Sequence, residues 1–397
     1  MGPLSGYKIL DLSRVLAGPW ASQIFADLGA EVIKIERPGK GDDTRAWGPP
    51  FVEESGISAY FCAANRGKKS VAIDMSKPEG QALIRRLAAK ADVVLENFKF
   101  GGLAKLGLGP EDLLTLNPRL VYCSITGFGQ TGPYRNRAGY DFLMQGMGGL
   151  MSVTGAPEGE PMKAGVAVVD VFTGLYASNA VMAALLERER SGLGQHIDLA
   201  LFDVQIATMA NQISSYLVSG AQPPRLGNAH PSIVPYQVFA TRDGHLILAI
   251  GNDDQFARFV TLAGAPELSQ DERFATNPAR VKHRAILVPL LETLLAARTT
   301  KDWTEALEAF GIPGGPINEF ADIDADPQVQ ARGIFKTLGP GLRGVASPMR
   351  FSRSEVADDR PPPRLGADTD EVLASVLALS ETCLLYTSPS PRDRTRS

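Results

Sequence analysis

The sequence predicts an α/β protein with a Rossmann-like large domain and a smaller α+β domain. In the first 130 residues, short apolar runs typical of strands alternate with stretches typical of helices, a pattern that favours a parallel sheet covered on both faces. A polar stretch rich in Pro and Gly at residues 219–231 resembles a linker. At 397 residues the chain is long enough for two domains.

The large domain is predicted from five strands and the helices between them. Strands are expected at residues 7–12, 31–36, 70–74, 92–95 and 120–125. Helices are expected at residues 19–28, 79–90 and 173–190, with a short one near Glu111. Because strands and helices alternate, we expect neighbouring strands to run parallel.

The second region carries a hairpin signal of its own. Residues 235–241 and 245–250 are strand-like, and Asp243-Gly244 between them is a typical hairpin turn. Helices are expected near residues 254–263, 284–297 and 300–310. We therefore predict a large domain at 1–220, a small domain at 225–320 and a returning segment at 321–380. Residues 381–397 resemble a translated cloning adaptor and are predicted to be a non-native tail.

Composition narrows the class of protein. A hydrophobic content of 44%, a charged content of 21% and a net charge of −4 indicate an ordinary globular protein without a basic stripe for nucleic acid. We see no signal peptide and no apolar segment approaching the length of a membrane span. Cys62, Cys123 and Cys383 lie far apart, as expected for reduced thiols in a cytoplasmic protein, and no metal-ligand spacing occurs.

Asp170 is the candidate nucleophile. It follows the apolar run at residues 166–169 and precedes the helix predicted at 173–190. The free N–H groups and the dipole of a helix N-terminus favour an ionised carboxylate by about 0.3–1 kcal/mol, and such a carboxylate can attack a carbonyl. A helix cap is the common role of an aspartate at this place, and the local sequence leaves both roles open.

Two loops are candidates for binding phosphate. Residues 127–132 (GFGQTG) match the GxGxxG pattern, but they follow a late strand and run into Pro133, so a glycine loop beside the active site is favoured over a dinucleotide site. Residues 36–45 carry Arg37, Lys40 and Arg45. In nucleotide-binding sheets this loop meets the ribose, where arginine can bind a ribose phosphate such as that of coenzyme A. A solvated charged loop is the alternative.

Six motifs occur in order between residues 4 and 378. They are LSRVLAGP at 12–19, VIKIERPGKGD at 32–42, LENF at 95–98, GFG at 127–129, GYD at 139–141 and VVDVFTG at 168–174. Together they resemble the class III CoA-transferase family, which also includes acyl-CoA racemases. The resemblance implies a Rossmann-like large domain, a small domain, two long connections and an interlocked homodimer.

The same resemblance assigns site residues. It places the nucleophile at Asp170 and transfers contacts with CoA to Val15, Arg37, Ile73, Asn97, Phe98, Lys105 and Tyr140. CoA would enter as part of the substrate, so no permanently bound cofactor and no metal is expected. The partners implied are an acyl-CoA, a carboxylic acid acceptor and a second copy of the chain, with no nucleic acid and no membrane.

Some positions depart from the formyl-CoA-type pattern. Leu16 stands where those relatives have glutamine, Thr126 and Ala138 stand where they have lysines, and residues 252–255 (NDDQ) replace a glycine-rich loop. These departures disfavour an oxalate and formate substrate pair. The stretches at 227–239, 251–256, 315–318 and 360–366 instead resemble the succinyl-CoA:dicarboxylate branch, which includes glutarate CoA-transferases.

The function expected from these observations is transfer of CoA from an acyl-CoA, such as succinyl-CoA, to a carboxylic acid such as glutarate, through a covalent aspartyl intermediate. A racemase needs a base on each face of the α-carbon, and Tyr140 stands where the racemase branch has histidine. A tyrosine of ordinary pKa near 10 is a poor base at neutral pH. A non-catalytic CoA-binding protein is the third alternative. Candidates for holding a remote carboxylate are Arg14, Arg66, His230 and Ser232.

Overall fold

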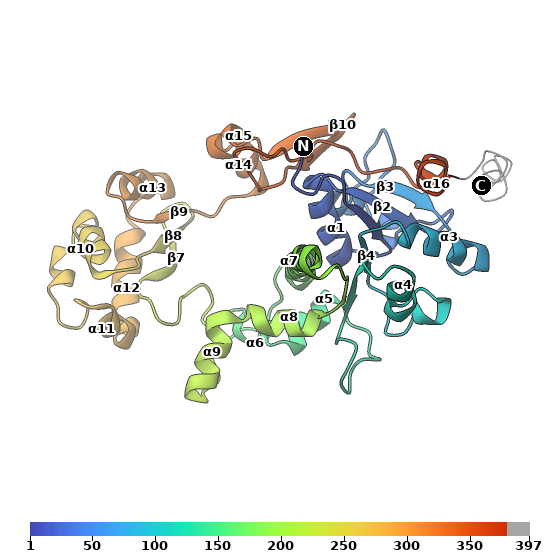
Figure 1. Ribbon diagram of the computed structural model, residues 1–397. Coiled ribbons are helices and arrows are strands. Elements are labelled where there is room, and N and C mark those ends of the chain that lie inside the picture. Colours follow the sequence, from blue (N-terminus) through green and yellow to red (C-terminus); the bar gives the residue numbers. More distant parts are fainter. Residues whose placement is uncertain (379–397) are drawn as a thin grey trace. The chain divides into compact units, whose positions relative to one another are not determined.

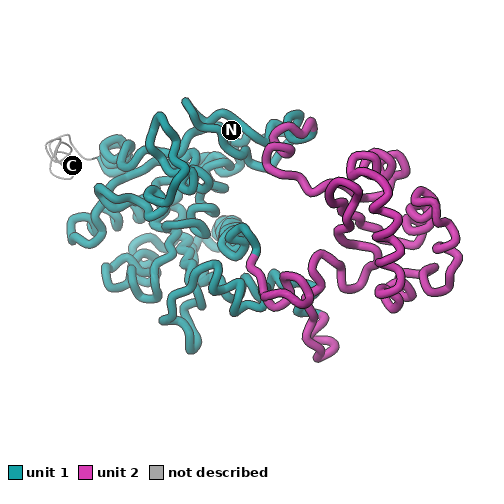
Figure 2. The backbone as a smooth tube through the Cα atoms, turned by 180° about the vertical axis from the view of Figure 1, so that it is seen from behind, with its two compact units in different colours: residues 1–150, 164–214, 328–397 teal, residues 151–163, 215–327 magenta. Residues whose placement is uncertain are grey.

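The computed structural model describes residues 1–378, which divide into two compact units (Figures 1 and 2). Among the described residues, the first unit contains 1–150, 164–214 and 328–378, and the second contains 151–163 and 215–327. Our predicted boundaries differ from this division, because residues 151–163 and 215–220 belong to the second unit rather than to the large domain, and residues 321–327 belong to it rather than to the returning segment. The predicted non-native tail at 381–397 lies outside the described residues.

The first unit is built on a six-stranded parallel sheet with the order β3-β2-β1-β4-β5-β6. Its strands are β1 Lys8–Asp11, β2 Glu31–Glu36, β3 Lys69–Ala72, β4 Val93–Glu96, β5 Val121–Thr126 and β6 His196–Ala200. The α/β class and the first five strands are confirmed. Strand β6 was missed, because this edge strand alternates polar and apolar residues instead of forming an apolar run. The strand order reverses between β1 and β4, which is where such sheets bind ligands.

Helices cover both faces of this sheet (Figure 1). Ile9 of β1 packs with α1 (Ala17–Asp27) and α7 (Val168–Ser191), whereas the next residue, Leu10, packs with α3 (Pro78–Ala88), α4 (Pro110–Leu116) and α16 (Thr369–Leu377). Successive residues of a strand point to opposite faces, so burial of both explains the continuous apolar runs in the sequence.

Helix α7 is longer than we predicted and begins at Val168 instead of Thr173. Its 24 residues are long and apolar enough to cross a membrane, contrary to our expectation that no segment approaches this length. The core helix of a soluble protein passes the same test, and α7 packs closely on α1. A Cβ atom added at Gly174 would lie 2.7 Å from the carbonyl oxygen of Ala17, so glycine at this position permits the close approach.

Shorter elements complete the first unit. They are η1 Asp43–Ala46, α2 Ala59–Ala64, η2 Ala104–Leu106, α5 Asp141–Met147, α8 Leu201–Thr208, β10 Phe335–Gly339 and β11 Leu342–Val345. Three more helices lie across its borders with the second unit, namely α6 Leu150–Val153, α9 Ala210–Ser219 and α15 Pro327–Ala331.

The second unit has a small antiparallel sheet packed against helices. The predicted hairpin is present as β7 Tyr236–Ala240 and β8 His245–Ala249, and β9 Gly314–Pro316 pairs with β8. The helices are α10 Asp253–Leu262, η3 Pro266–Ser269, α11 Asn277–Lys282, α12 Arg284–Leu295, α13 Thr300–Ala309 and α14 Phe320–Ala325. Phe256, Leu291 and Trp303 lie in its separate hydrophobic core.

Candidate active site

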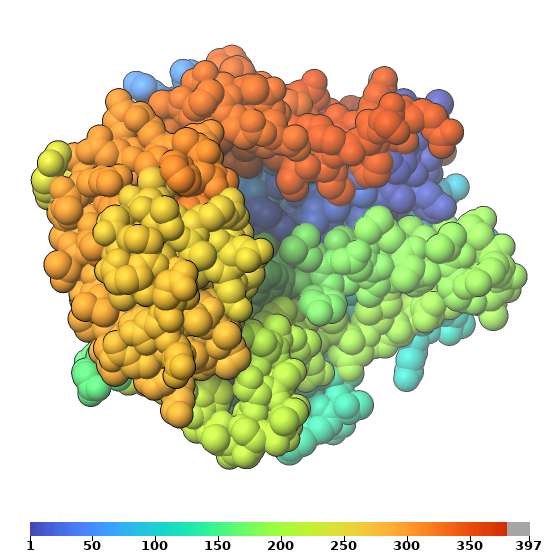
Figure 3. Space-filling model, turned by 90° about the vertical axis from the view of Figure 1, so that its left-hand side faces the viewer, coloured from blue at the N-terminus to red at the C-terminus, as the bar shows by residue number. Residues whose placement is uncertain are grey.

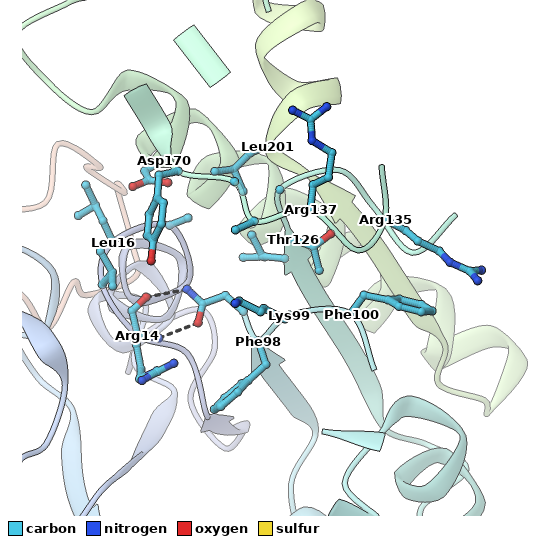
Figure 4. A pocket seen from close by; sticks show the side chains of 18 of the residues that line it. Arg14, Leu16, Phe98, Lys99, Phe100, Thr126, Arg135, Arg137, Asp170 and Leu201 are labelled. Atoms are coloured by element: carbon cyan, nitrogen blue, oxygen red, sulfur yellow. Dashed lines mark hydrogen bonds between the residues drawn. The ribbon is translucent and has the colours of Figure 1, made fainter. Parts of the chain in front are cut away.

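A cavity of about 180 Å³ opens at the carboxyl ends of β1 and β4 (Figure 4). Its walls come from the loop after β1, the loop after β4, the segment between β5 and α5, and the first turn of α7. In Figure 4, Arg14 and Phe98 lie on one side of the cavity and Asp170 lies on another. The cavity therefore occupies the ligand position of a Rossmann sheet.

The loop after β1 is held in a strained conformation. The amide of Asn97 bonds both backbone groups of Arg14, accepting from N–H at 2.9 Å and donating to the carbonyl at 2.6 Å (Figure 4). Val15 then adopts a φ of +70°, which is unfavourable for a β-branched residue and costs about 1–3 kcal/mol. The N–H of Val15 faces Asp42 at 3.3 Å, and Asp42 is paired at 2.9 Å with the buried Lys34.

Two glycines bring the GFG and GYD motifs together. A Cβ atom added at Gly139 would lie 2.6 Å from the Cα atom of Gly127, and one added at Gly127 would lie 2.8 Å from the Cα atom of Gly139. Both glycines line the cavity. The GxGxxG match therefore includes a site of close backbone packing beside Asp170, and its Gly127 is needed for that contact.

Asp170 lies in the first turn of α7, and its environment corrects our electrostatic expectation. Burial, followed by the nearby Asp141 carboxylate, raises the pKa of Asp170 to about 7. Asp141 already accepts the N–H of Val169 at 2.8 Å and that of Asp170 at 3.4 Å. Within residues 1–378, no group donates a hydrogen bond to the Asp170 carboxylate, so Asp170 is not the cap of this helix.

A second cavity of about 310 Å³ lies at the ends of β2 and β3 and shares Arg14, Asp43 and Phe98 with the first. Arg37 and Lys40 line it and are exposed, which leaves them accessible to an anion. Arg45, which we grouped with them from the sequence, makes other contacts. It pairs with Glu36 at 2.6 Å and lies 3.7 Å from the centre of the Phe61 ring.

The predicted site residues are mostly gathered in these two cavities. Val15, Asn97, Phe98 and Tyr140 line the first cavity with Asp170, and Arg37, Ile73 and Phe98 line the second. Lys105 lies on η2, is exposed and lines neither cavity. Tyr140 is 71% exposed, so it is not part of the hydrophobic core.

The four candidates for binding a remote carboxylate lie in different surroundings. Arg14 lines the first cavity. Arg66 is buried and binds both oxygens of Asp27, at 2.8 and 2.5 Å, so it is not available to a substrate. His230 and Ser232 belong to the second unit, where the Ser232 N–H donates to Nδ1 of His230 at 3.0 Å.

Sequence reasoning missed three cations that line the first cavity: Lys99, Arg135 and Arg137. Their positions beside the LENF, GFG and GYD motifs could have indicated them. Of the positions that depart from the formyl-CoA-type pattern, Leu16, Thr126 and Ala138 also line this cavity. Asn252 instead caps α10 in the second unit by accepting the N–H of Gln255 at 2.9 Å.

Comparisons with known proteins agree with this geometry. Residues 4–369 match the model of CoA-transferase family III. The chain is 54% identical to a succinate–glutarate CoA-transferase of Agrobacterium fabrum, over 96% of this chain and 97% of that protein. It is 43% identical to a human succinyl-CoA:glutarate CoA-transferase, over 96% and 88% respectively. A CAIB/BAIF family protein from Brucella suis has a similar crystal structure, with 52% identity, a TM-score of 0.86 and coverage of 94% and 99%.

Proposed function

This chain belongs to CoA-transferase family III, and from that premise we propose that it moves CoA from succinyl-CoA to glutarate through a covalent intermediate on Asp170. The chain is a CoA-transferase. The substrate pair rests on relatives whose names specify succinate and glutarate. The intermediate rests on one observation, a carboxylate without a hydrogen-bond donor among residues 1–378 that lies in the cavity where this sheet would bind a ligand.

The two cavities suit the two ends of a CoA thioester. The ribose phosphate would bind near Arg37 and Lys40 in the second cavity, because arginine pairs well with phosphate. The pantetheine arm would pass Arg14 and Phe98, which line both cavities, and bring the thioester to Asp170. Val15, Asn97 and Tyr140 would border its path, and no permanently bound cofactor takes part in this scheme.

The proposed chemistry conserves the energy of the thioester. An Asp170 oxygen attacks the succinyl carbonyl carbon, the C–S bond breaks, and a mixed anhydride and CoA thiolate form. The thiolate attacks the Asp170 carbonyl, releasing succinate and leaving an aspartyl-CoA thioester. Glutarate then attacks this thioester, forming a second anhydride and freeing thiolate. The thiolate finally attacks the glutaryl carbonyl, which gives glutaryl-CoA and restores the Asp170 carboxylate.

The ionisation of Asp170 suits this chemistry. Its pKa of about 7 leaves most of the side chain ionised at pH 8, and a carboxylate of raised basicity is a stronger nucleophile than an ordinary one. The remote carboxylate of a dicarboxylic acid also needs a cation. Arg14, Lys99, Arg135 and Arg137 line the same cavity and supply this charge.

A homodimer in the cytoplasm is part of the proposal. The outer face of α7 exposes Phe172, Leu175, Tyr176 and Leu186 at helical spacing, and this part of the chain appears in green at the surface in Figure 3. A second copy that interlocks with the first would cover these side chains. Free Cys62 and Cys123 support a reducing compartment. Sedimentation of the purified protein at several concentrations tests the dimer.

Labelling tests the intermediate. The protein is mixed with labelled succinyl-CoA, trapped with hydroxylamine and digested. We expect the trapped adduct on the peptide that contains Asp170. Asp170→Asn should lose transfer and the adduct, whereas Asp359→Asn, an exposed aspartate outside both cavities, should keep both. Turnover to glutaryl-CoA without an adduct at Asp170 would contradict the mechanism, and absence of glutaryl-CoA would contradict the substrate pair.

A further inference from the structure

We infer that Asp141 is a positioning residue for Asp170, because it caps the helix turn that carries the nucleophile and places a second carboxylate beside it. This inference deepens the proposed function and rests on Asp170 as the nucleophile. Asp141 lies in the first turn of α5, and Asp170 lies in the first turn of α7. The two helices meet at their N-termini, although 29 residues separate the two aspartates.

Asp141 supplies the cap that α7 lacks. A helix N-terminus leaves N–H groups without partners, and a nearby side chain normally accepts one of them. The N-cap residue of α7 is Ala167, which has no side chain able to do so. Oδ1 of Asp141 accepts the N–H of Val169 at 2.8 Å and faces that of Asp170 at 3.4 Å. Asp141 therefore fixes the backbone that carries the nucleophile.

Gln145 holds Asp141 in place. Gln145 is fully buried and donates through Nε2 to Oδ2 of Asp141 at 2.6 Å. Its Oε1 accepts the N–H of Ala164 at 2.8 Å, in the segment that leads into α7. The amide of Gln145 thus ties α5 to the chain before α7. Both oxygens of Asp141 are engaged, so this carboxylate has little freedom to move away from Asp170.

Asp141 also places a negative charge near Asp170. Asp141 adds to the effect of burial and disfavours the ionised form of Asp170. Asp170 also acts on Tyr60 of α2, whose pKa is raised mainly by burial and then by Asp170. The remaining titratable and charged groups that line the cavity are Tyr140, Asp43, Arg14, Lys99, Arg135 and Arg137. Asp141 is the carboxylate that accepts hydrogen bonds from the first turn of α7. Removing its charge should therefore change the pKa of Asp170 more than that of any other group.

Two variants separate the charge from the geometry. Asp141→Asn keeps an oxygen that can accept from α7 but removes the negative charge. Gln145→Met keeps the charge of Asp141 but removes the amide that holds it. Both are compared with the native protein and with Asp359→Asn, by measuring kcat/KM for succinyl-CoA from pH 5.5 to 8.5, adduct formation at Asp170, and circular dichroism.

We expect Asp141→Asn to lose activity at pH 8.5, because its nucleophile is less basic, and to recover relative to the native protein as pH falls. Lowering the pKa of Asp170 by about one pH unit would raise the ratio of variant to native kcat/KM about eightfold between pH 8.5 and 5.5. Gln145→Met should lower kcat by a factor that is constant with pH. Glu96 and Lys68 also have pKa values of about 7, but neither changes between the proteins compared, so they cancel in the ratio.

Each outcome decides a separate question. A folded Asp141→Asn protein with a constant ratio at all pH values would refute the role of the charge, while the native adduct at Asp170 would leave the proposed function intact. Native protein without that adduct would refute the proposed mechanism instead. If Asp141→Asn does not fold, Gln145→Met still tests the positioning role, because unchanged kcat in that variant would overturn it.

Discussion

Replacing Asp170 by asparagine should stabilise this enzyme while abolishing its activity. The pKa of the Asp170 carboxyl is raised from 3.8 to about 7, first by burial and then by Asp141. Folding therefore favours the protonated form of this side chain. At a pH above 7 the folded protein must hold an ionised, poorly solvated carboxylate, which the unfolded chain exposes to water. Asparagine has nearly the same shape and carries no charge, so it avoids this penalty.

The sign and size of the effect follow from linkage. A carboxyl whose pKa is raised in the folded state destabilises that state fully above its folded pKa, and this penalty disappears as pH falls to the unfolded value. A shift from 3.8 to about 7 corresponds to about 4 kcal/mol. Because the cavity is open to solvent, which screens part of the charge, we expect Asp170→Asn to gain about 1–4 kcal/mol at pH 8. The gain should shrink between pH 7 and 4 and vanish below pH 4.

Unfolding in urea measures this directly. The native protein, Asp170→Asn and Asp359→Asn are titrated at pH 4, 6 and 8 at one protein concentration, since association would otherwise shift the midpoints. The control removes a charge from an exposed aspartate that lines neither cavity. An Asp170→Asn protein no more stable than the native one at pH 8, or a gain equal at all three pH values, would refute the electrostatic account of Asp170.

Three further predictions concern the basic loop at residues 36–45 and the wall of the first cavity. Arg37→Ala should raise the KM for succinyl-CoA about tenfold and leave that for the dephospho-CoA ester nearly unchanged; equal increases would remove Arg37 from the phosphate role. Arg45→Ala should instead lower stability by about 3–5 kcal/mol, because it removes the guanidinium that is paired with the buried Glu36, and a change in KM at unchanged melting temperature would contradict this. Gly139→Ala should cost about 1–3 kcal/mol and impair turnover, because its Cβ would lie 2.6 Å from the Gly127 Cα atom; native activity and melting temperature would show that this contact relaxes freely.

Much of the first unit could be predicted from local patterns. Apolar runs such as residues 31–36 mark buried strands of a parallel sheet, since both faces of β2 are covered. Strand β6 gave a weaker signal because its polar and apolar residues alternate, and it was missed for this reason. The beginning of α7 was also misplaced, because its apolar first turn at Val168 and Val169 fits a strand as well as a helix.

Side chains of one type in one loop could not be told apart by sequence. Arg37 and Arg45 lie in the same basic segment, but packing pairs Arg45 with Glu36 and leaves Arg37 exposed beside a cavity. Similarly, Arg14 and Arg66 were equal candidates for a substrate cation, and only the contact with Asp27 shows that Arg66 is committed to the core. Pair formation of this kind depends on which side chains the fold brings into contact, whether they are 9 residues apart, as Arg45 and Glu36 are, or 39, as Arg66 and Asp27 are.

The sequence by itself determined the α/β architecture, the family and the identity of Asp170 as the candidate nucleophile. These depend on strand periodicity and on ordered motifs, and both are properties of the local order of residues. The tertiary structure alone decided the state of that nucleophile. The helix N-terminus predicted an ionised aspartate, but Asp141, 29 residues earlier in the chain, takes the free N–H groups and adds a like charge. A pKa depends on desolvation and on neighbouring charges in space, and neither is visible until the chain has folded.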